Sequence, residues 1–406
     1  MELKLPYGNQ EICLDIPEKN LLSILQLKPP TNRPQIDVDQ LNKSLKDFLG
    51  TSKSVLIIVN DYTRPTPTEK ILSMIEPEIV NYDFRMIVAC GSHRPPTNDE
   101  FIQIFGNYYN KYQNKILVHD AKDNTRLKFL GKTRRNVPVW LNQAIWEAEK
   151  LIVINSVEPH YFAGFTGGRK SFLPGVAGLE TITANHKLSL SPKAKTLSLT
   201  GNPVNEDMNE IAKMIPRPIF SIQIVIDNLH QVYSIHYGDI FNSFDQAVED
   251  AKLIFCVPIK EKADIVIALV QEPYDVNFYQ SEKAIENAKL ALKENGIMIV
   301  ASKCRKGVGD DEFVRLLASA ENPKQALEKI EKEFVLGYHK SAKLAEILMW
   351  AEIWTVMPIS DEIIRSVFMR PFTDINLALK TALEKKGENA KIFILPDASL
   401  TVPLLI

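Results

Sequence analysis

Short apolar runs of strand length alternate along this chain with patterns of helix length, and this alternation constrains the fold more than any other feature. In the first half, apolar runs occupy 54–59, 84–89, 115–118 and 151–154. Helix starts follow the first two runs, because Thr68 and Thr97 stand in short polar segments of the kind that begin helices. Strands that alternate with helices favour parallel pairing. The sequence therefore predicts an α/β protein with mostly parallel sheets flanked by helices.

The length of 406 residues is too great for one ordinary core and predicts two domains. The first series of elements continues with strands expected at 220–226 and 232–235 and a helix at 244–254. A second series follows Pro258, with strands expected at 263–270, 296–301 and 352–357 and helices at 281–293, 311–319 and 340–350. We expect domains at 1–257 and 258–406, with a last strand at 391–395 that can return to either domain.

Composition excludes several classes of protein. The formal charge of -2 shows no cationic excess, so nucleic acid and acidic membranes are not expected partners. The four cysteines are scattered without a CxxC pair, which argues against a disulfide framework or a zinc finger. No export signal and no run of eighteen apolar residues is present, so we expect a cytoplasmic protein.

Chemically capable residues follow three of the expected strands. Asp61 and Arg64 come after the first, His93 after the second, and Glu158 and His160 after the fourth. Because the carboxyl ends of parallel strands meet at one edge of a sheet, these side chains should face a common crevice. Each also has an ordinary interpretation: Asp61 as a helix cap, Arg64 as its ion-pair partner, and each histidine as a locally hydrogen-bonded side chain.

The densest segment is Glu158 to Gly178, which contains a glycine-rich loop and Lys170. Glycines at 164, 167, 168 and 175 would let the backbone approach a phosphate closely. The segment is not a Walker A loop, because Arg169 stands where glycine should precede the lysine. A mononucleotide phosphate and a purely structural glycine-rich turn both remain open. A helical pattern farther on presents His186, a possible metal ligand.

Together these turns resemble the nickel-pincer lactate racemase family. The matching residues are Asp61-x-x-Arg64-Pro65, Gly91-Ser-His93-Arg-Pro95, Glu158 to Gly178, Ala184-Asn-His186 and Tyr279-Gln280-x-x-Lys283. The likeness runs from about residue 50 to the end of the chain. It implies two α/β domains with the active site in the cleft between them, and a pyridinium mononucleotide whose thio-substituted arms and ring carbon hold nickel.

Carried over by position, the resemblance gives each residue a role. Lys170 resembles the lysine that is joined to the cofactor, and His186 resembles the imidazole ligand of the nickel. His93 and His160 resemble the acid/base pair, and Arg64 and Lys283 the cations that hold the substrate's carboxylate. The remaining implied contacts are Asp61, Gly167, Gly168 and Arg169 for the cofactor, and Tyr279 and Gln280 for the substrate.

The implied activity is racemisation or epimerisation of a 2-hydroxy acid, lactate or a relative, by reversible hydride transfer. Its implied partners are that small molecule and the proteins that make the cofactor. Two other classes stay open: a hydrolase with zinc on His93, His160 and His186, and a non-catalytic protein that binds a nucleotide or cofactor.

Overall fold

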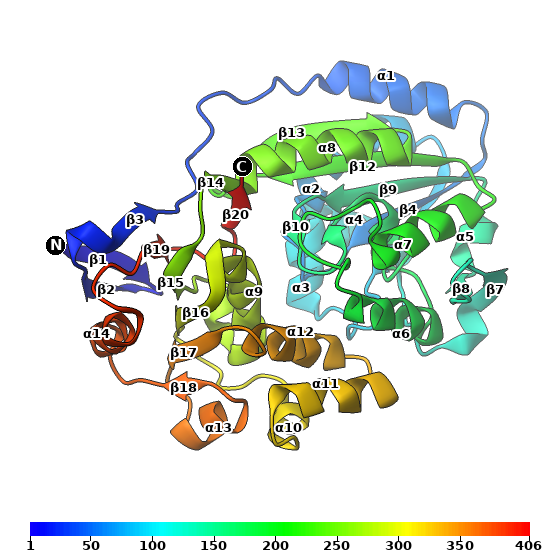
Figure 1. Cartoon of the computed structure of the whole chain (residues 1–406). Coiled ribbons are helices and arrows are strands. Elements are labelled where there is room, and N and C mark those ends of the chain that lie inside the picture. Colours follow the sequence, from blue (N-terminus) through cyan, green and yellow to red (C-terminus); the bar gives the residue numbers. More distant parts are fainter. The chain divides into compact units, whose positions relative to one another are not determined.

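The computed structural model describes residues 1–406, and they form two compact units (Figure 1). The central unit is Pro29–Ile254. The terminal unit combines Met1–Lys28 with Phe255–Ile406. No helix in either unit has the length and apolarity needed to cross a membrane.

The central unit is built on a six-stranded sheet of order β13-β12-β9-β4-β5-β6, parallel except for β13 at one edge. Its strands are β4 (Ser54–Asn60), β5 (Asp83–Ala89), β6 (Ile116–Val118), β9 (Lys150–Ser156), β12 (Ile219–Ile226) and β13 (Val232–Gly238). Two short antiparallel pairs are β7 (Leu127–Lys132) with β8 (Pro138–Asn142), and β10 (Pro159–His160) with β11 (Gly164–Phe165). The helices are α1 (Val38–Leu49), α2 (Thr68–Ile79), α3 (Asn98–Phe105), α4 (Asn107–Tyr112), α5 (Ala144–Glu147), α6 (Leu179–Lys187), α7 (Pro203–Met214) and α8 (Ile240–Phe255).

Local chemistry explains where the helices of the central unit start. Asp37 caps α1 by accepting from the Gln40 amide, and Thr97 with Glu100 forms a complete capping box at α3. The apolar faces of α1, α2 and α3 pack with alternate residues of β4 and β5, such as Ile57, in one core. The sheet is thereby fixed, and so is the edge at which its parallel strands end.

The terminal unit has its own six-stranded sheet of order β18-β17-β16-β15-β19-β3, parallel throughout. Its strands are β3 (Leu21–Ile24), β15 (Ala263–Leu269), β16 (Leu292–Ala301), β17 (Glu352–Val356), β18 (Arg370–Pro371) and β19 (Ile392–Leu395), with a hairpin of β1 (Glu2–Tyr7) and β2 (Gln10–Asp15) and a parallel pair of β14 (Cys256–Ile259) and β20 (Val402–Leu405). The helices are α9 (Phe278–Ala288), α10 (Asp311–Ala318), α11 (Pro323–Lys332), α12 (Tyr338–Leu348), α13 (Asp361–Ser366) and α14 (Ile375–Lys386).

Both faces of this second sheet are buried. Val266 of β15 packs in the core formed with α9 to α12, and Ile267 packs in the core formed with α14 and the hairpin. Parallel strands covered on both faces are continuous apolar runs, which is why they are easy to recognise in the sequence. The expected α/β class with two mostly parallel sheets is confirmed.

The division of the chain differs from the expected one in its first residues. We expected 1–257 to form one domain, but β3 pairs with β19, so residues 1–28 belong to the terminal unit. The strand expected at 391–395 is β19, and it pairs with β15 in the terminal unit. The expected helix at 281–293 ends earlier, because α9 stops at Ala288 and β16 starts at Leu292.

Candidate active site

The three turns singled out in the sequence leave neighbouring strands. In the central sheet β4 lies between β9 and β5, and all three run in the same direction. The turns that start at Asp61, Gly91 and Val157 therefore leave the sheet at the same edge. Two polar contacts between these turns, described next, confirm that they converge.

Asp61 and His93 form a hydrogen-bonded pair across two of the turns. The Nδ1 atom of His93 lies 2.7 Å from Oδ2 of Asp61, whose other oxygen accepts from the Thr63 hydroxyl at 2.6 Å. Burial alone would raise the pKa of Asp61, but the hydrogen bonds from His93 and Thr63 outweigh it and lower that pKa. When the buried carboxylate accepts Nδ1–H, Nε2 of the half-exposed imidazole is the nitrogen that can accept a proton.

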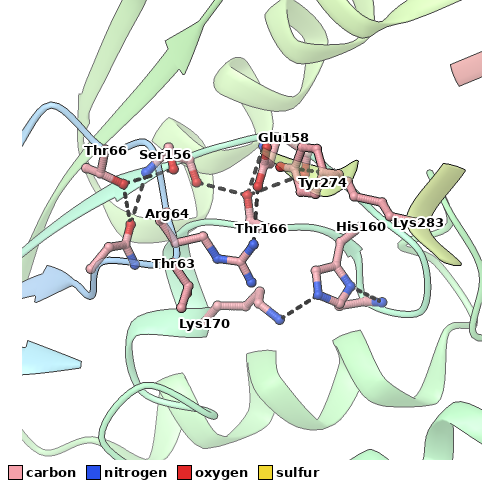
Figure 2. Close-up of polar contacts among 12 residues, drawn as sticks. Thr63, Arg64, Thr66, Ser156, Glu158, His160, Thr166, Lys170, Tyr274 and Lys283 are labelled. Carbon is pink, nitrogen blue, oxygen red and sulfur yellow. Dashed lines mark hydrogen bonds and ion pairs between the residues drawn. The ribbon is translucent and has the colours of Figure 1, made fainter. Parts of the chain in front are cut away.

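Arg64 and Glu158 join the first turn to the third. One guanidinium nitrogen of Arg64 lies 3.3 Å from Oε1 of Glu158, and the Glu158 carboxylate is nearly buried (Figure 2). The backbone amide of Glu158 in turn donates to the hydroxyl of Thr166 at 2.9 Å. Arginine carries five donors in a planar fork, so this contact holds Arg64 in place and leaves it able to bind a carboxylate ligand.

Phe162 brings three of the expected site residues together. The rings of His160 and His186 lie 4.6 and 5.1 Å from the Phe162 ring, and the Lys170 amine lies 5.7 Å from it. Nζ of Lys170 is 3.5 Å from Nε2 of His160 (Figure 2). The structure makes the buried Phe162 ring the common neighbour of an acid/base candidate, the lysine and a possible metal ligand.

The Lys170 amine is shifted toward its neutral form. Burial is the main cause of a pKa well below the usual lysine value, and the positive charges of Arg64 and Arg169 add to it. The carboxylate of Glu158 opposes the shift without cancelling it. A neutral amine is a nucleophile, so Lys170 is chemically suited to form a covalent bond to a ligand.

Arg169 points into the protein, contrary to the expected contact with a cofactor. Its guanidinium donates to the carbonyls of Ala163, Phe165, Thr166 and Gly167, and its Nε donates to the side chain of Asn205. These five contacts use all five N–H donors. Arg169 is 1% exposed and packs over the Phe244 ring, so it shapes the loop instead of touching a ligand.

The glycines of the same loop also face protein. Gly167 has φ +88°, and a Cβ there would lie 2.5 Å from Val157 and 2.8 Å from Gln223. The amide of Gly168 donates to the Gln223 side chain at 2.9 Å. Protein therefore fills the space on the Cβ side of Gly167, and packing alone explains the absence of a side chain there. The two glycines let the loop pack against its own sheet, which is the structural interpretation that the sequence left open.

A histidine that the sequence analysis missed anchors the approach to His186. His119 is fully buried, with Nε2 2.9 Å from the Ala177 carbonyl oxygen and Nδ1 3.1 Å from the side-chain nitrogen of Asn142. The next turn of chain, at Gly178, leads directly into α6, which carries His186. A signal was present, because His119 follows the apolar run at 115–118 just as Asp61 and His93 follow theirs.

The three expected substrate contacts of the second half lie in the terminal unit, at the start of α9. The amine of Lys283 donates to the Tyr274 hydroxyl at 2.9 Å and lies 4.2 Å from that ring's centroid (Figure 2). Tyr279 packs its ring against Phe313, and the Gln280 amide is capped by Asn277. The first two turns of α9 thus carry the whole segment.

The histidines do not form a shared metal site. No three His, Cys, Asp or Glu side chains of the chain lie in a group that could hold a metal ion. His93 is engaged by Asp61, whereas His160 and His186 flank Phe162. The three-histidine zinc alternative therefore has no support from the geometry.

Comparison with known families agrees with this arrangement. The model of the lactate racemase N-terminal domain matches residues 7–197, and that of the lactate racemase C-terminal domain matches residues 259–402. The first match begins within the hairpin of the terminal unit, so the family boundaries differ from the two compact units.

Individual relatives share the full length of the chain. It is 28% identical to the lactate racemases of Thermoanaerobacterium thermosaccharolyticum and Lactiplantibacillus plantarum, across 97% of this chain and 97% and 98% of theirs. The solved lactate racemase apoprotein from T. thermosaccharolyticum superposes with a TM-score of 0.89, over all of both chains. A Thermotoga maritima protein at 18% identity shares the fold, with a TM-score of 0.69 over 91% of this chain and 99% of its own. The chain belongs to the lactate racemase family.

Proposed function

We propose that this protein inverts the configuration at C2 of a 2-hydroxy acid, as a racemase or an epimerase. The observation that carries the proposal is the cluster around Phe162, where His160, Lys170 and His186 meet within one unit. The Asp61–His93 pair and Arg64 lie on neighbouring turns of the same sheet edge. Membership of the lactate racemase family supports this reaction class, and the choice of acid is left to experiment.

We propose a nickel-pincer nucleotide as the cofactor, held by Lys170 and His186. The residues fit this group, because burial lowers the pKa of Lys170 and so favours the nucleophilic form of its amine, and His186 supplies one imidazole. A cofactor that brings sulfur and carbon donors of its own needs only one protein ligand, and imidazole suits nickel. Such a group, when bound, would supply a reversible acceptor for the hydrogen at C2 of the substrate.

The protein's own residues supply binding and proton transfer. Arg64 binds the substrate's carboxylate, and Lys283 of the terminal unit is proposed to do the same. His93 and His160 take the proton of the hydroxyl and return it, one for each enantiomer, because imidazole titrates near neutral pH. Asp61 keeps His93 in the tautomer whose Nε2 can accept that proton.

The test is a screen of enantiopure 2-hydroxy acids with protein produced together with the cofactor's biosynthetic enzymes, following optical inversion. Inversion of at least one acid in D₂O, with C2 left unlabelled by NMR, is the expected result, because a C2 hydrogen transferred as hydride would not exchange with solvent. Early deuterium uptake at C2 would instead indicate simple proton abstraction. Protein shown to carry the cofactor but inert toward every acid would favour the non-catalytic carrier function.

A further inference from the structure

A buried lysine of α12 reaches the first turn of α9 within the terminal unit. The amine of Lys340 donates to the carbonyl of Tyr279 at 2.7 Å and lies 4.1 Å from the centroid of its ring. The same amine is 3.5 Å from Oε2 of Glu282. The Lys340 side chain is 10% exposed and that of Glu282 is 0% exposed, so these contacts form away from solvent.

A gain in folding stability does not explain the ion pair of Lys340 and Glu282 well. Beyond this ion pair with Lys340, neither carboxylate oxygen of Glu282 has a hydrogen-bond partner, although both are buried. Removing a carboxylate and an ammonium from water costs several kcal/mol per ion, and such pairs are often replaceable by apolar side chains without loss. Burial raises the pKa of Glu282 to about 7 and lowers the pKa of Lys340, as expected for ions held with incomplete compensation.

What the pair does contact is the segment expected to bind substrate. The first turn of α9 carries Tyr279 and Gln280, and the second carries Lys283. Asn277 caps the helix by accepting from the Gln280 backbone amide at 2.8 Å. The Lys283 amine has a separate hydrogen bond, which it donates to the Tyr274 hydroxyl. Lys340 contacts both the backbone carbonyl and the ring of Tyr279. The helix cap at Asn277 makes no hydrogen bond to either of these groups.

We infer that Lys340 is a positioning residue, which fixes the first turn of α9 and thereby the placement of Gln280 and Lys283. The inference rests on the proposed function, because it takes these two side chains to be substrate contacts. Lys340 does not touch substrate in this account. It acts through the carbonyl and ring of Tyr279, with Glu282 as the counter-charge that keeps its amine between the two helices.

The first experiment compares Lys340→Met with Lys343→Met. Lys343 lies one turn farther along α12, is equally buried and pairs with Glu346 of its own helix at 2.9 Å, so it is a matched control. Hydrogen exchange of the unloaded protein should show the amides at the start of α9 exchanging about tenfold faster in Lys340→Met, with no such change in Lys343→Met. Equal exchange in both variants would overturn the inference.

The second experiment separates positioning from stability. The double variant Lys340→Met/Glu282→Leu removes both charges, so it leaves no ion stranded and should melt no lower than wild type. In cofactor-loaded protein we expect its KM for the accepted 2-hydroxy acid to rise about tenfold while kcat stays within about twofold, as for loss of uniform binding. Lys340→Arg keeps a donor and the charge, so its KM should stay much closer to the wild-type value than to that of the double variant.

The two experiments also keep the inference and the proposed function apart. A wild-type protein that is inert toward every acid would defeat the proposed function, yet hydrogen exchange would still report whether Lys340 holds the turn. An unchanged KM in an active, stable double variant would overturn the positioning role and leave the racemase function standing.

Discussion

Replacing Arg169 with methionine should destabilise the central unit strongly, although the residue sits in the most ligand-like part of the sequence. The guanidinium satisfies the carbonyls of Ala163, Phe165 and Thr166, for which it is the donor inside a buried loop. Gly167 keeps a second partner, because its carbonyl also accepts from the Lys170 amide. An acceptor left buried without a donor costs about 1–3 kcal/mol, so three of them amount to about 3–9 kcal/mol.

Relief of the cation's own burial offsets part of this cost. Burial lowers the pKa of Arg169 to about 9, and the negative charge of Asp245 offsets only part of this shift. The buried cation is therefore itself unfavourable. We therefore take the lower part of the range, about 3–5 kcal/mol. For a unit of this length that corresponds to a fall in Tm of about 6–20 °C.

Thermal unfolding followed by circular dichroism tests this, with Arg126→Met as the control. Arg126 is mostly exposed and forms a surface ion pair with Asp123 at 4.0 Å, which contributes at most about 1 kcal/mol. Arg169→Lys keeps a charge but not the planar fork, so it should recover only part of the loss. An Arg169→Met protein that melts within about 2 °C of wild type would refute the argument that this side chain holds the loop.

Three further predictions concern chemistry and pH. Replacing His93 or His160 with alanine should slow inversion in both directions by about 10² to 10⁴ while the cofactor stays attached, and near-normal turnover would remove that residue from the mechanism. Lys170→Ala should lose the covalent adduct seen by intact-mass spectrometry in protein made with the cofactor's biosynthetic enzymes, and an adduct that persists would place the attachment elsewhere. Burial lowers the pKa of His119 below the unfolded value of about 6.5, so its contribution to the free energy of unfolding is present above that pH and is lost as the pH falls below it. Urea midpoints of wild type and His119→Gln should converge between about pH 7 and pH 5, and parallel midpoints would contradict this.

The sequence predicted that the turns lie close together, because this depends only on whether the strands that precede them run in the same direction. Parallel strands end at a common edge, so Asp61 and His93 had to be near one another once their strands were recognised. His119 also follows a strand, but that strand is only three residues long, so its signal in the sequence was weaker.

The contacts of the loop around Lys170 were harder to predict, because the sequence does not show which groups lie next to its glycines. A glycine that makes room for a phosphate and one that makes room for Gln223 look identical in a sequence. Arg169 likewise reads as a ligand-binding cation, and only the folded loop shows that the protein's own carbonyls occupy it. The role of residues 1–28 was missed because a strand partner far away in sequence leaves no local trace.

The pairing of β3 with β19 has a consequence for how the protein is made. Ile24 and Leu395 lie about 370 residues apart, and a ribosome adds roughly 5–20 residues each second, so β3 waits roughly 20–75 s for its neighbour. The central unit is continuous in the chain and can fold during that wait, while the start of the chain stays exposed to proteases and to other nascent chains. A shortened gene covering only 259–402 would leave β19 as a bare edge strand, prone to aggregation, whereas one covering 29–254 would encode a whole folding unit.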